Sequence, residues 1–213
     1  MPDGHTADRP TELTVSENGT VSQAFRVDPV PDALHVIKTC DVFPSPKVLQ
    51  IAQPIITPSG TFCVPLVTHG NGNLITADDP ANVGEEVVIW AYGFGVTSPM
   101  STTGEASPTP AARISSFLYF QFDFRVNAAP SQPYFNPLIL TPIPAPLFAG
   151  LTPGPVGLYQ VNVRVPNPPT ALPRCTTGRQ SLSPYNAVRS NLTIDLGAAA
   201  SFDGAAICVE PPK

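Results

Sequence analysis

The residues most suited to chemistry lie between His69 and Glu86. The run His69-Gly-Asn-Gly contains the residue types of an esterase oxyanion-hole loop. Such an enzyme also needs a Gly-x-Ser-x-Gly elbow between a strand and a helix, and the chain contains no such elbow. A Ser/His/Asp triad assembled from distant positions stays open, but no pattern favours it. We therefore interpret His69 as a turn residue and expect no catalytic residue.

Oxygen-bearing side chains gather in the same stretch and raise the question of a metal site. Calcium takes six to eight oxygen ligands, and the candidates are Asn71, Asn73, Asp78, Asp79, Glu85 and Glu86. However, no D-x-D-x-D-G pattern is present. Asp79 also precedes Pro80 as a helix cap would, which predicts one helical turn ending at Gly84. We expect no metal and no cofactor, with calcium, or a glycosidase pair of carboxylates across a cleft, as alternatives.

The remaining candidates are better explained as structural residues than as functional ones. Gly93-Phe94-Gly95 lacks the third glycine and the helix of a dinucleotide loop, so it indicates a tight turn after a strand. His35 lies between Leu34 and Val36, and we expect its ring on the opposite side from both, exposed or hydrogen-bonded locally. Trp90 alternates with its neighbours along one strand face, which favours a place in the core.

Composition indicates the class of fold that must position these residues. The 213 residues include 28 prolines and 15 glycines, while only 13% are charged. Interior prolines exclude long helices, and 42% hydrophobic residues are too many for a disordered chain. The net charge of −5 argues against a nucleic-acid partner. No apolar run approaches the roughly 18 residues of a membrane span. We expect an all-β protein.

The four cysteines bear on the compartment. Cys40, Cys63, Cys175 and Cys208 form no C-x-x-C pair, so disulfides fit better than zinc or redox chemistry, with buried free thiols as the alternative. Four cysteines allow three connectivities; we favour Cys40–Cys63 and Cys175–Cys208, because both close short loops. The polar segment 1–8 shows no signal peptide. We expect an extracellular or cell-surface protein whose leader has been removed, rather than a cytosolic one.

Alternation of apolar and polar residues predicts short antiparallel strands. Asn18-Gly19, flanked by alternating residues, predicts a β-hairpin. Residues 114–126 predict one strand, in which the alternation from Leu118 onward places Leu118, Phe120, Phe122 and Phe124 on a core face. A second alternating strand follows Tyr159, with Val161 and Val163 pointing inward. Together these patterns predict an immunoglobulin-like antiparallel β-sandwich with an N-terminal hairpin extension.

Proline-rich connectors suggest how the chain is divided. We expect a flexible tail at residues 1–10, followed by an N-terminal hairpin segment at 11–57 that packs on or precedes the sandwich. The sandwich itself then occupies residues 58–213 and carries a disulfide-bearing insert at 167–190.

Several stretches carry a family resemblance. They are "GEEVVIWAYGFG" (84–95), "LFAGLTPGPVGLYQVNVRVP" (147–166), "VTHGNGNLITADDPANVGE" (67–85) and "SNLTIDLGAAASFDGAAICV" (190–209). The chain resembles the Solibacter-type uncharacterised C-terminal domain of secreted bacterial proteins over residues 60–210, and more distantly immunoglobulin-like modules of the IPT/TIG type. The resemblance implies the fold and an extracellular location but no catalytic residues.

Tyr159 offers one detailed test of the immunoglobulin-like prediction. It begins an alternating strand just after Gly154-Pro-Val-Gly, where immunoglobulin-like folds place a tyrosine whose hydroxyl bonds nearby backbone. Val161 occupies the position at which antibody domains carry a cysteine. The alternative is an ordinary half-buried strand aromatic.

Three functions are compatible with these observations. We favour a non-enzymatic secreted or cell-surface module with a structural, spacer or adhesive role and an unknown protein or glycan partner. A carbohydrate-binding module would use exposed aromatics, for which the candidates are Trp90, Tyr119, Tyr134 and Tyr185. An assembly subunit would polymerise by strand addition, with the N-terminal hairpin pairing with a neighbour's sheet edge.

Overall fold

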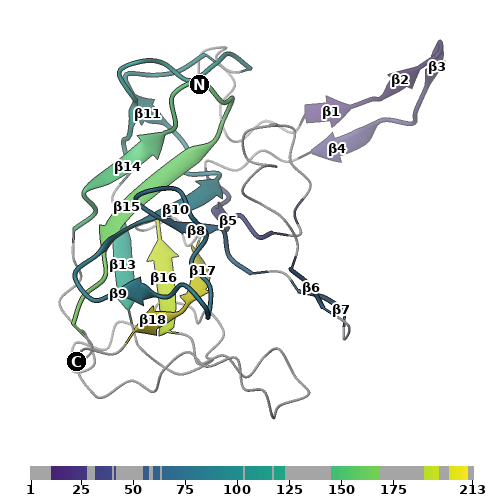
Figure 1. The fold of residues 1–213 in the computed structure, drawn as a ribbon. Coiled ribbons are helices and arrows are strands. Elements are labelled where there is room, and N and C mark those ends of the chain that lie inside the picture. Colours follow the sequence, from purple (N-terminus) through teal and green to yellow (C-terminus); the bar gives the residue numbers. More distant parts are fainter. Residues whose placement is uncertain are drawn as a thin grey trace.

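The fold is seen in a computed structural model of the full chain (Figure 1). The structure describes residues 11–27, 32–39, 41, 55–57, 60–62, 64–102, 104–116, 118–122, 145–167, 190–196 and 202–210. These residues form strands, turns and loops, with no helix among them. Accordingly, no helix in this described part is long and apolar enough to cross a membrane.

A seven-stranded antiparallel sheet forms one layer. Its strand order is β11-β12-β14-β15-β10-β5, and β8 pairs with a further stretch of β10. The strands are β5 (His35–Val36), β8 (Val67–His69), β10 (Glu86–Tyr92), β11 (Thr97–Ser98), β12 (Arg113–Ile114), β14 (Phe148–Leu151) and β15 (Tyr159–Arg164). Because β5 pairs with β10, His35 and Val36 of the N-terminal segment belong to this sheet.

A three-stranded sheet forms the second layer, behind the first in Figure 1. Its order is β13-β16-β17, and the strands are β13 (Tyr119–Phe122), β16 (Ser190–Asp195) and β17 (Phe202–Ile207). At one end of the sandwich β9 (Ala81–Asn82) pairs in parallel with β18 (Val209–Glu210). A separate small hairpin joins β6 (Ile55–Thr57) to β7 (Gly60–Phe62).

The core lies between the two sheets, as the alternation predicts. Val87, Ile89 and Ala91 of β10 are fully buried, while the residues between them are half-buried. Val161 and Val163 face inward from β15 and Phe120 and Phe122 from β13, so these predicted core residues are confirmed. Leu118 is partly buried against the same cluster, and Phe124 lies outside the described residues. The described fold is an antiparallel β-sandwich.

Two details of the predicted elements are wrong. Residues 114–126 do not form one strand: β12 ends at Ile114 in the first sheet, and β13 begins at Tyr119 in the second. Alternation looks alike on either sheet, so it cannot show where the chain crosses between layers. The helical turn before Gly84 is also absent, because the Ala81 N–H donates instead to the carbonyl of Cys208 (3.0 Å) and the segment extends as β9.

The end of β10 is fixed by Tyr159. Its hydroxyl donates to the carbonyl oxygen of Gly95 (2.6 Å), and its ring lies 5.3 Å from the buried ring of Phe94. The hydroxyl thus bonds a backbone carbonyl, but the acceptor lies in a distant segment and not in the nearby backbone that the immunoglobulin-like corner predicts. Gly93 has a φ of +78°, and a Cβ there would lie 2.0 Å from the Ala33 carbonyl oxygen, so glycine is required.

The N-terminal hairpin extends away from the sandwich (Figure 1). It comprises β1 (Thr11–Leu13), β2 (Ser16–Glu17), β3 (Thr20–Val21) and β4 (Phe25–Val27). Asn18 and Gly19 form its turn with φ values of 50° and 80°, which the two-residue hairpin turn requires. The predicted hairpin is thus confirmed, and we call residues 11–27 the arm.

Candidate functional site

His69 is the last residue of β8 and the first of the following turn. Its N–H donates to the carbonyl of Asn73, and its own carbonyl accepts from Gly72, each over 2.9 Å. It lies opposite Val87 of β10, so its side chain points to the inward face of the sheet. The interpretation as a turn residue describes its backbone, but the ring is only 10% exposed.

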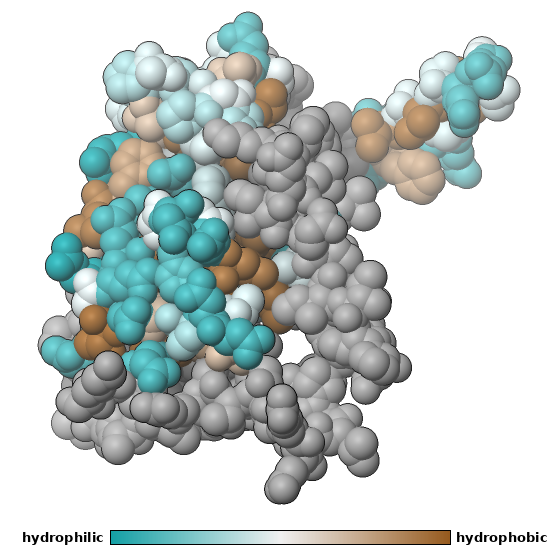
Figure 2. Space-filling view, in the orientation of Figure 1, coloured by the Kyte–Doolittle hydropathy of each residue, from teal (hydrophilic) through white to brown (hydrophobic). Residues whose placement is uncertain are grey.

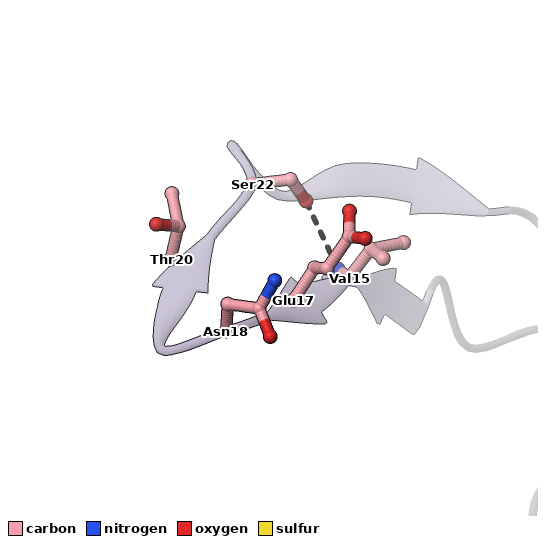
Figure 3. A pocket seen from close by; sticks show the side chains of 5 residues that line it. All are labelled: Val15, Glu17, Asn18, Thr20 and Ser22. Atoms are coloured by element: carbon pink, nitrogen blue, oxygen red, sulfur yellow. Dashed lines mark hydrogen bonds between the residues drawn. The ribbon is translucent and has the colours of Figure 1, made fainter.

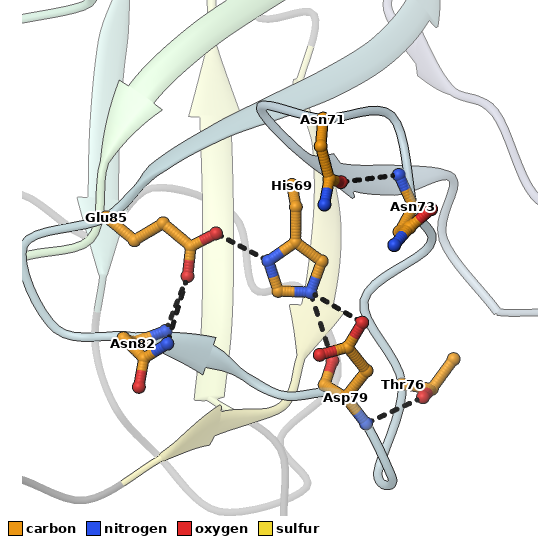
Figure 4. Close-up of polar contacts among 7 residues, drawn as sticks. All are labelled: His69, Asn71, Asn73, Thr76, Asp79, Asn82 and Glu85. Carbon is orange, nitrogen blue, oxygen red and sulfur yellow. Dashed lines mark hydrogen bonds and ion pairs between the residues drawn. The ribbon is translucent and has the colours of Figure 1, made fainter.

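Both ring nitrogens of His69 face oxygen atoms (Figure 4). Nδ1 lies 2.5 Å from Oε1 of Glu85. Nε2 lies 3.2 Å from the carbonyl oxygen of Asp79 and 3.5 Å from its Oδ2. A carbonyl can only accept a hydrogen bond, and so can an ionised carboxylate. The arrangement is therefore best satisfied by a protonated imidazolium that donates from both nitrogens.

The electrostatics agree with an imidazolium–carboxylate pair. Burial by itself lowers the pKa of His69, but the hydrogen bonds to Glu85 and Asp79 outweigh it and leave the pKa above its ordinary value. For Glu85, burial raises the pKa, but the hydrogen bonds from Asn82 and His69 prevail and the pKa lies below its ordinary value. Opposite shifts in two hydrogen-bonded partners favour the charged form of both.

Further hydrogen bonds hold the partners of His69 in place. Oε2 of Glu85 accepts from the backbone N–H of Asn82 (2.8 Å) and from its side-chain amide (3.4 Å). The Asp79 N–H donates to the Thr76 hydroxyl, and the Thr76 N–H donates to the Asp79 carbonyl, each over 3.0 Å. The cluster consequently joins the end of β8, the turn at Thr76–Asp79 and the turn between β9 and β10. We call His69, Asp79, Asn82 and Glu85 the latch.

The structure brings together only some of the candidate calcium ligands. Asn71 accepts the backbone N–H of Asn73 (2.9 Å) within their own turn. Glu86 lies on the other face of β10, where it accepts the side-chain amide of Asn162 (2.8 Å), and Asp78 is exposed. Across the described ranges, no group of three or more His, Cys, Asp or Glu residues is arranged to hold a metal ion.

Chemically, His69 and Glu85 of the latch correspond to two of the three members of a catalytic triad, and the position of the third member is occupied. A carboxylate that orients a histidine is the usual positioning pair, and catalysis then needs a hydroxyl or thiol at the second ring nitrogen. Here the Asp79 carbonyl and carboxylate occupy that nitrogen. Sequence reasoning considered His69 and Glu85 separately. The antiparallel pairing of β8 with β10 links them, because it places His69, at the end of β8, beside the start of β10, which Glu85 directly precedes.

His35 forms a second contact of the same kind. Its Nε2 lies 2.9 Å from Oδ2 of Asp41, which confirms the expected local hydrogen bond. Its Nδ1 also lies 3.4 Å from Asp203 of β17, whose carboxylate accepts the Val36 N–H (2.8 Å). The contact with Asp203 joins the two sheets, and sequence reasoning missed it because the partners lie at opposite ends of the chain.

The remaining candidates are only partly described. Trp90 is half-buried outside the main core, where it packs with Tyr92 on a second cluster of Ile37, Leu66 and Leu158, and its N–H donates to Thr68 (3.3 Å). Tyr119 lies in β13, whereas Tyr134 and Tyr185 lie outside the described residues.

Of the four cysteines, only Cys208 is described. It is buried after β17, and this part of the chain contains no free cysteine. Cys40, Cys63 and Cys175 lie outside the described residues, so both pairings stay predictions.

Comparison of the chain with family models, curated proteins and solved structures found no match. The resemblance to the Solibacter-type C-terminal domain therefore stays a prediction made from the residues quoted above.

Proposed function

We propose that this protein is a non-enzymatic immunoglobulin-like module with a structural, spacer or adhesive role outside the cell or on its surface. The latch is the observation that carries the proposal. It uses the histidine and the carboxylates with the strongest claim to chemistry to tie three loops together at one end of the sandwich. The ring protons of His69 are thus engaged in hydrogen bonds that stabilise the fold.

The surroundings of Trp90 support a structural role over glycan binding. An aromatic ring that binds a sugar presents its face to solvent. Trp90 instead packs with Tyr92 in the second cluster and has committed its N–H to Thr68. This favours the structural role among the described aromatics, and a glycan array that gave a specific ligand would reverse the order of the two functions.

Two measurements test the proposal. The first is protease treatment of intact producing cells, followed by detection with an antibody against the chain. We expect the chain to be digested without lysis, and its protection until the cells are opened would contradict the proposed location.

The second measurement is a panel of ester and glycoside hydrolysis assays on the purified protein. We expect no turnover above background. Turnover that is lost in His69→Gln but retained in the control His35→Gln, with both variants folded by circular dichroism, would overturn the non-enzymatic assignment.

A further inference from the structure

The arm gathers exposed apolar side chains away from the sandwich. Leu13, Val15, Val21 and Phe25 are 55%, 58%, 60% and 62% exposed. They make up half of the eight large hydrophobic residues that are exposed in the described part of the chain, although the arm is only 17 residues long. Figure 2 shows hydrophobic (brown) and hydrophilic (teal) side chains on the projection that stands clear of the body. Exposed apolar surface gathered in this way marks a site of association.

The base of the arm has one apolar face and one charged face. Leu13 lies opposite Phe25 across β1 and β4, and Glu12 lies opposite Arg26. Residues that are directly opposite point to the same side of the ribbon, and neighbours along a strand point to opposite sides. Leu13 and Phe25 therefore share one face, and the oppositely charged pair occupies the other.

The tip of the arm is more polar than its base. A shallow open hollow there is lined by Val15, Glu17, Asn18, Thr20 and Ser22 (Figure 3). Within it the Val15 N–H donates to the hydroxyl of Ser22 (2.9 Å) rather than to a backbone carbonyl. The strand register also changes by one residue along the arm: Leu13 lies opposite Phe25 at the base, whereas Ser16 lies opposite Val21 nearer the tip. Because of this irregularity, regular strand addition is favoured at β1 and β4.

Both edges at the base are open in the described structure. β1 and β4 form a two-stranded sheet in which neither strand has a second neighbour. An isolated two-stranded hairpin is at best marginally stable in water, and an open edge is a template for another strand. A further copy of the arm supplies the missing strand, because β1 of one copy can continue the sheet after β4 of another in the register that the arm already uses.

The charges favour this head-to-tail order. When β1 of the next copy follows β4, Glu12 meets Arg26 again, and Leu13 meets Phe25 again on the opposite face. Opposite charges directly across a strand pair are favourable, whereas like charges are not. A two-fold pairing of β1 with β1 at the same register would instead bring two copies of Glu12 together.

We propose that the arm binds the arm of a second copy of this chain, edge to edge and head to tail, by addition of β1 to β4. Such a contact does not close on itself, so it extends into a linear assembly. This deepens the proposed function, since it names the partner of the structural module, but the two fail separately. A surface-exposed monomer would overturn only the self-association, and a self-associating chain confined inside the cell would overturn only the location.

Analytical ultracentrifugation of the full chain over a wide concentration range is the first test. We expect the weight-average mass to rise continuously with concentration for the wild type and to stay monomeric for Leu13→Ser/Phe25→Ser. The matched control is Val156→Ser, which removes an equally exposed apolar side chain (55%) from the body. A monomeric wild type, or loss of association in Val156→Ser but not in the arm variant, would refute the proposal.

Charge exchange tests the order of the strands. In Glu12→Arg/Arg26→Glu the opposite charges are kept within each arm and between identical arms, so we expect this variant to self-associate. Its mixture with fluorescently labelled wild type places like charges across every mixed contact, and mixed association should be about tenfold weaker than either self-association. Equal mixing would refute the head-to-tail pairing, and failure of the double variant to self-associate would refute the register.

Discussion

Replacing Glu85 with glutamine removes the charge that stabilises the His69 imidazolium while it preserves the size of the side chain. The amide oxygen can still accept from Asn82, as the carboxylate does. The backbone contacts of the latch therefore persist, and the substitution isolates the charge. We expect the variant to fold and to be less stable at mildly acidic pH.

The expected loss follows from the burial of the pair. The His69 and Glu85 side chains are 10% and 23% exposed, so the pair lies between an exposed ion pair, which contributes about 0–1 kcal/mol, and a fully buried one, whose disruption costs about 3–5 kcal/mol. A hydrogen bond to a charged group contributes about 1.5–3 kcal/mol. We therefore expect Glu85→Gln to lower the free energy of unfolding by about 2 kcal/mol near pH 5.5.

The pH dependence identifies the mechanism. The pKa of His69 is raised above 6.5, so its contribution to stability is complete below that pH and is lost as the pH rises through the folded-state pKa. The pKa of Glu85 is lowered below 4.5, so its contribution is complete above that pH and is lost as the pH falls through the folded-state pKa. Both contributions are complete only between pH 4.5 and 6.5.

Urea unfolding followed by the fluorescence of Trp90, the only tryptophan, measures both effects. The difference between wild type and Glu85→Gln should be largest in this window and shrink toward pH 9. Glu86→Gln is the matched control, because Glu86 is the next residue but is exposed on the other face of β10. A difference that does not depend on pH, or an equal loss in the control, would refute the ion-pair interpretation.

Three further predictions concern the core and the disulfides. Phe122→Ala should cost about 3–5 kcal/mol in the free energy of unfolding because the side chain is buried; a loss below about 1 kcal/mol would remove it from the core. Tyr159→Phe should cost about 1–2 kcal/mol because it leaves the Gly95 carbonyl without its hydroxyl donor, and an unchanged urea midpoint would contradict this. A non-reduced tryptic digest should link peptides Thr39–Lys47 to Val48–Arg113 and Cys175–Arg179 to Ser190–Lys213; Thr39–Lys47 joined to either C-terminal peptide would exclude the proposed pairing.

The described residues just before Cys40 lie beside those just after Cys63. Lys38 forms an antiparallel bridge with Pro65, and Thr39 donates its N–H to the Val64 carbonyl (2.9 Å). Cys40 and Cys63 themselves lie outside the described residues, so their pairing stays a prediction that the tryptic digest tests.

Elements with a strong local pattern could be predicted from the sequence. The Asn18-Gly19 turn and the alternation in β10 and β15 depend on residues close together in the chain, and the structure has all three. The helical turn predicted before Gly84 does not form: Asp79 and Pro80 suit a helix locally, but the Ala81 N–H donates to the carbonyl of Cys208, far along the chain. Long-range pairing overrides such local preferences.

The latch shows the same limit for the candidate site. Its residue types could be recognised in the sequence, but their roles depend on which atoms meet. Asp79 was assigned to a helix cap, yet its carbonyl and carboxylate face His69. Glu85 and Glu86 look equivalent in the sequence. In the structure, however, Glu86 is exposed on the face of β10 that points away from the core. That distinction needs the strand register.

The parallel pairing of β9 with β18 has a consequence for the order of folding. Val209 pairs with Ala81 far back along the chain, so the segment that carries Asp79, Asn82 and Glu85 gains this support only after a long loop has closed. Loop closure of this kind is entropically costly and slow. The arm contains only local pairs, and hairpins form within microseconds. A newly made chain can therefore form its apolar arm before the sandwich is complete. Under the proposed arm-to-arm pairing, contact between nascent copies would then compete with folding of the body.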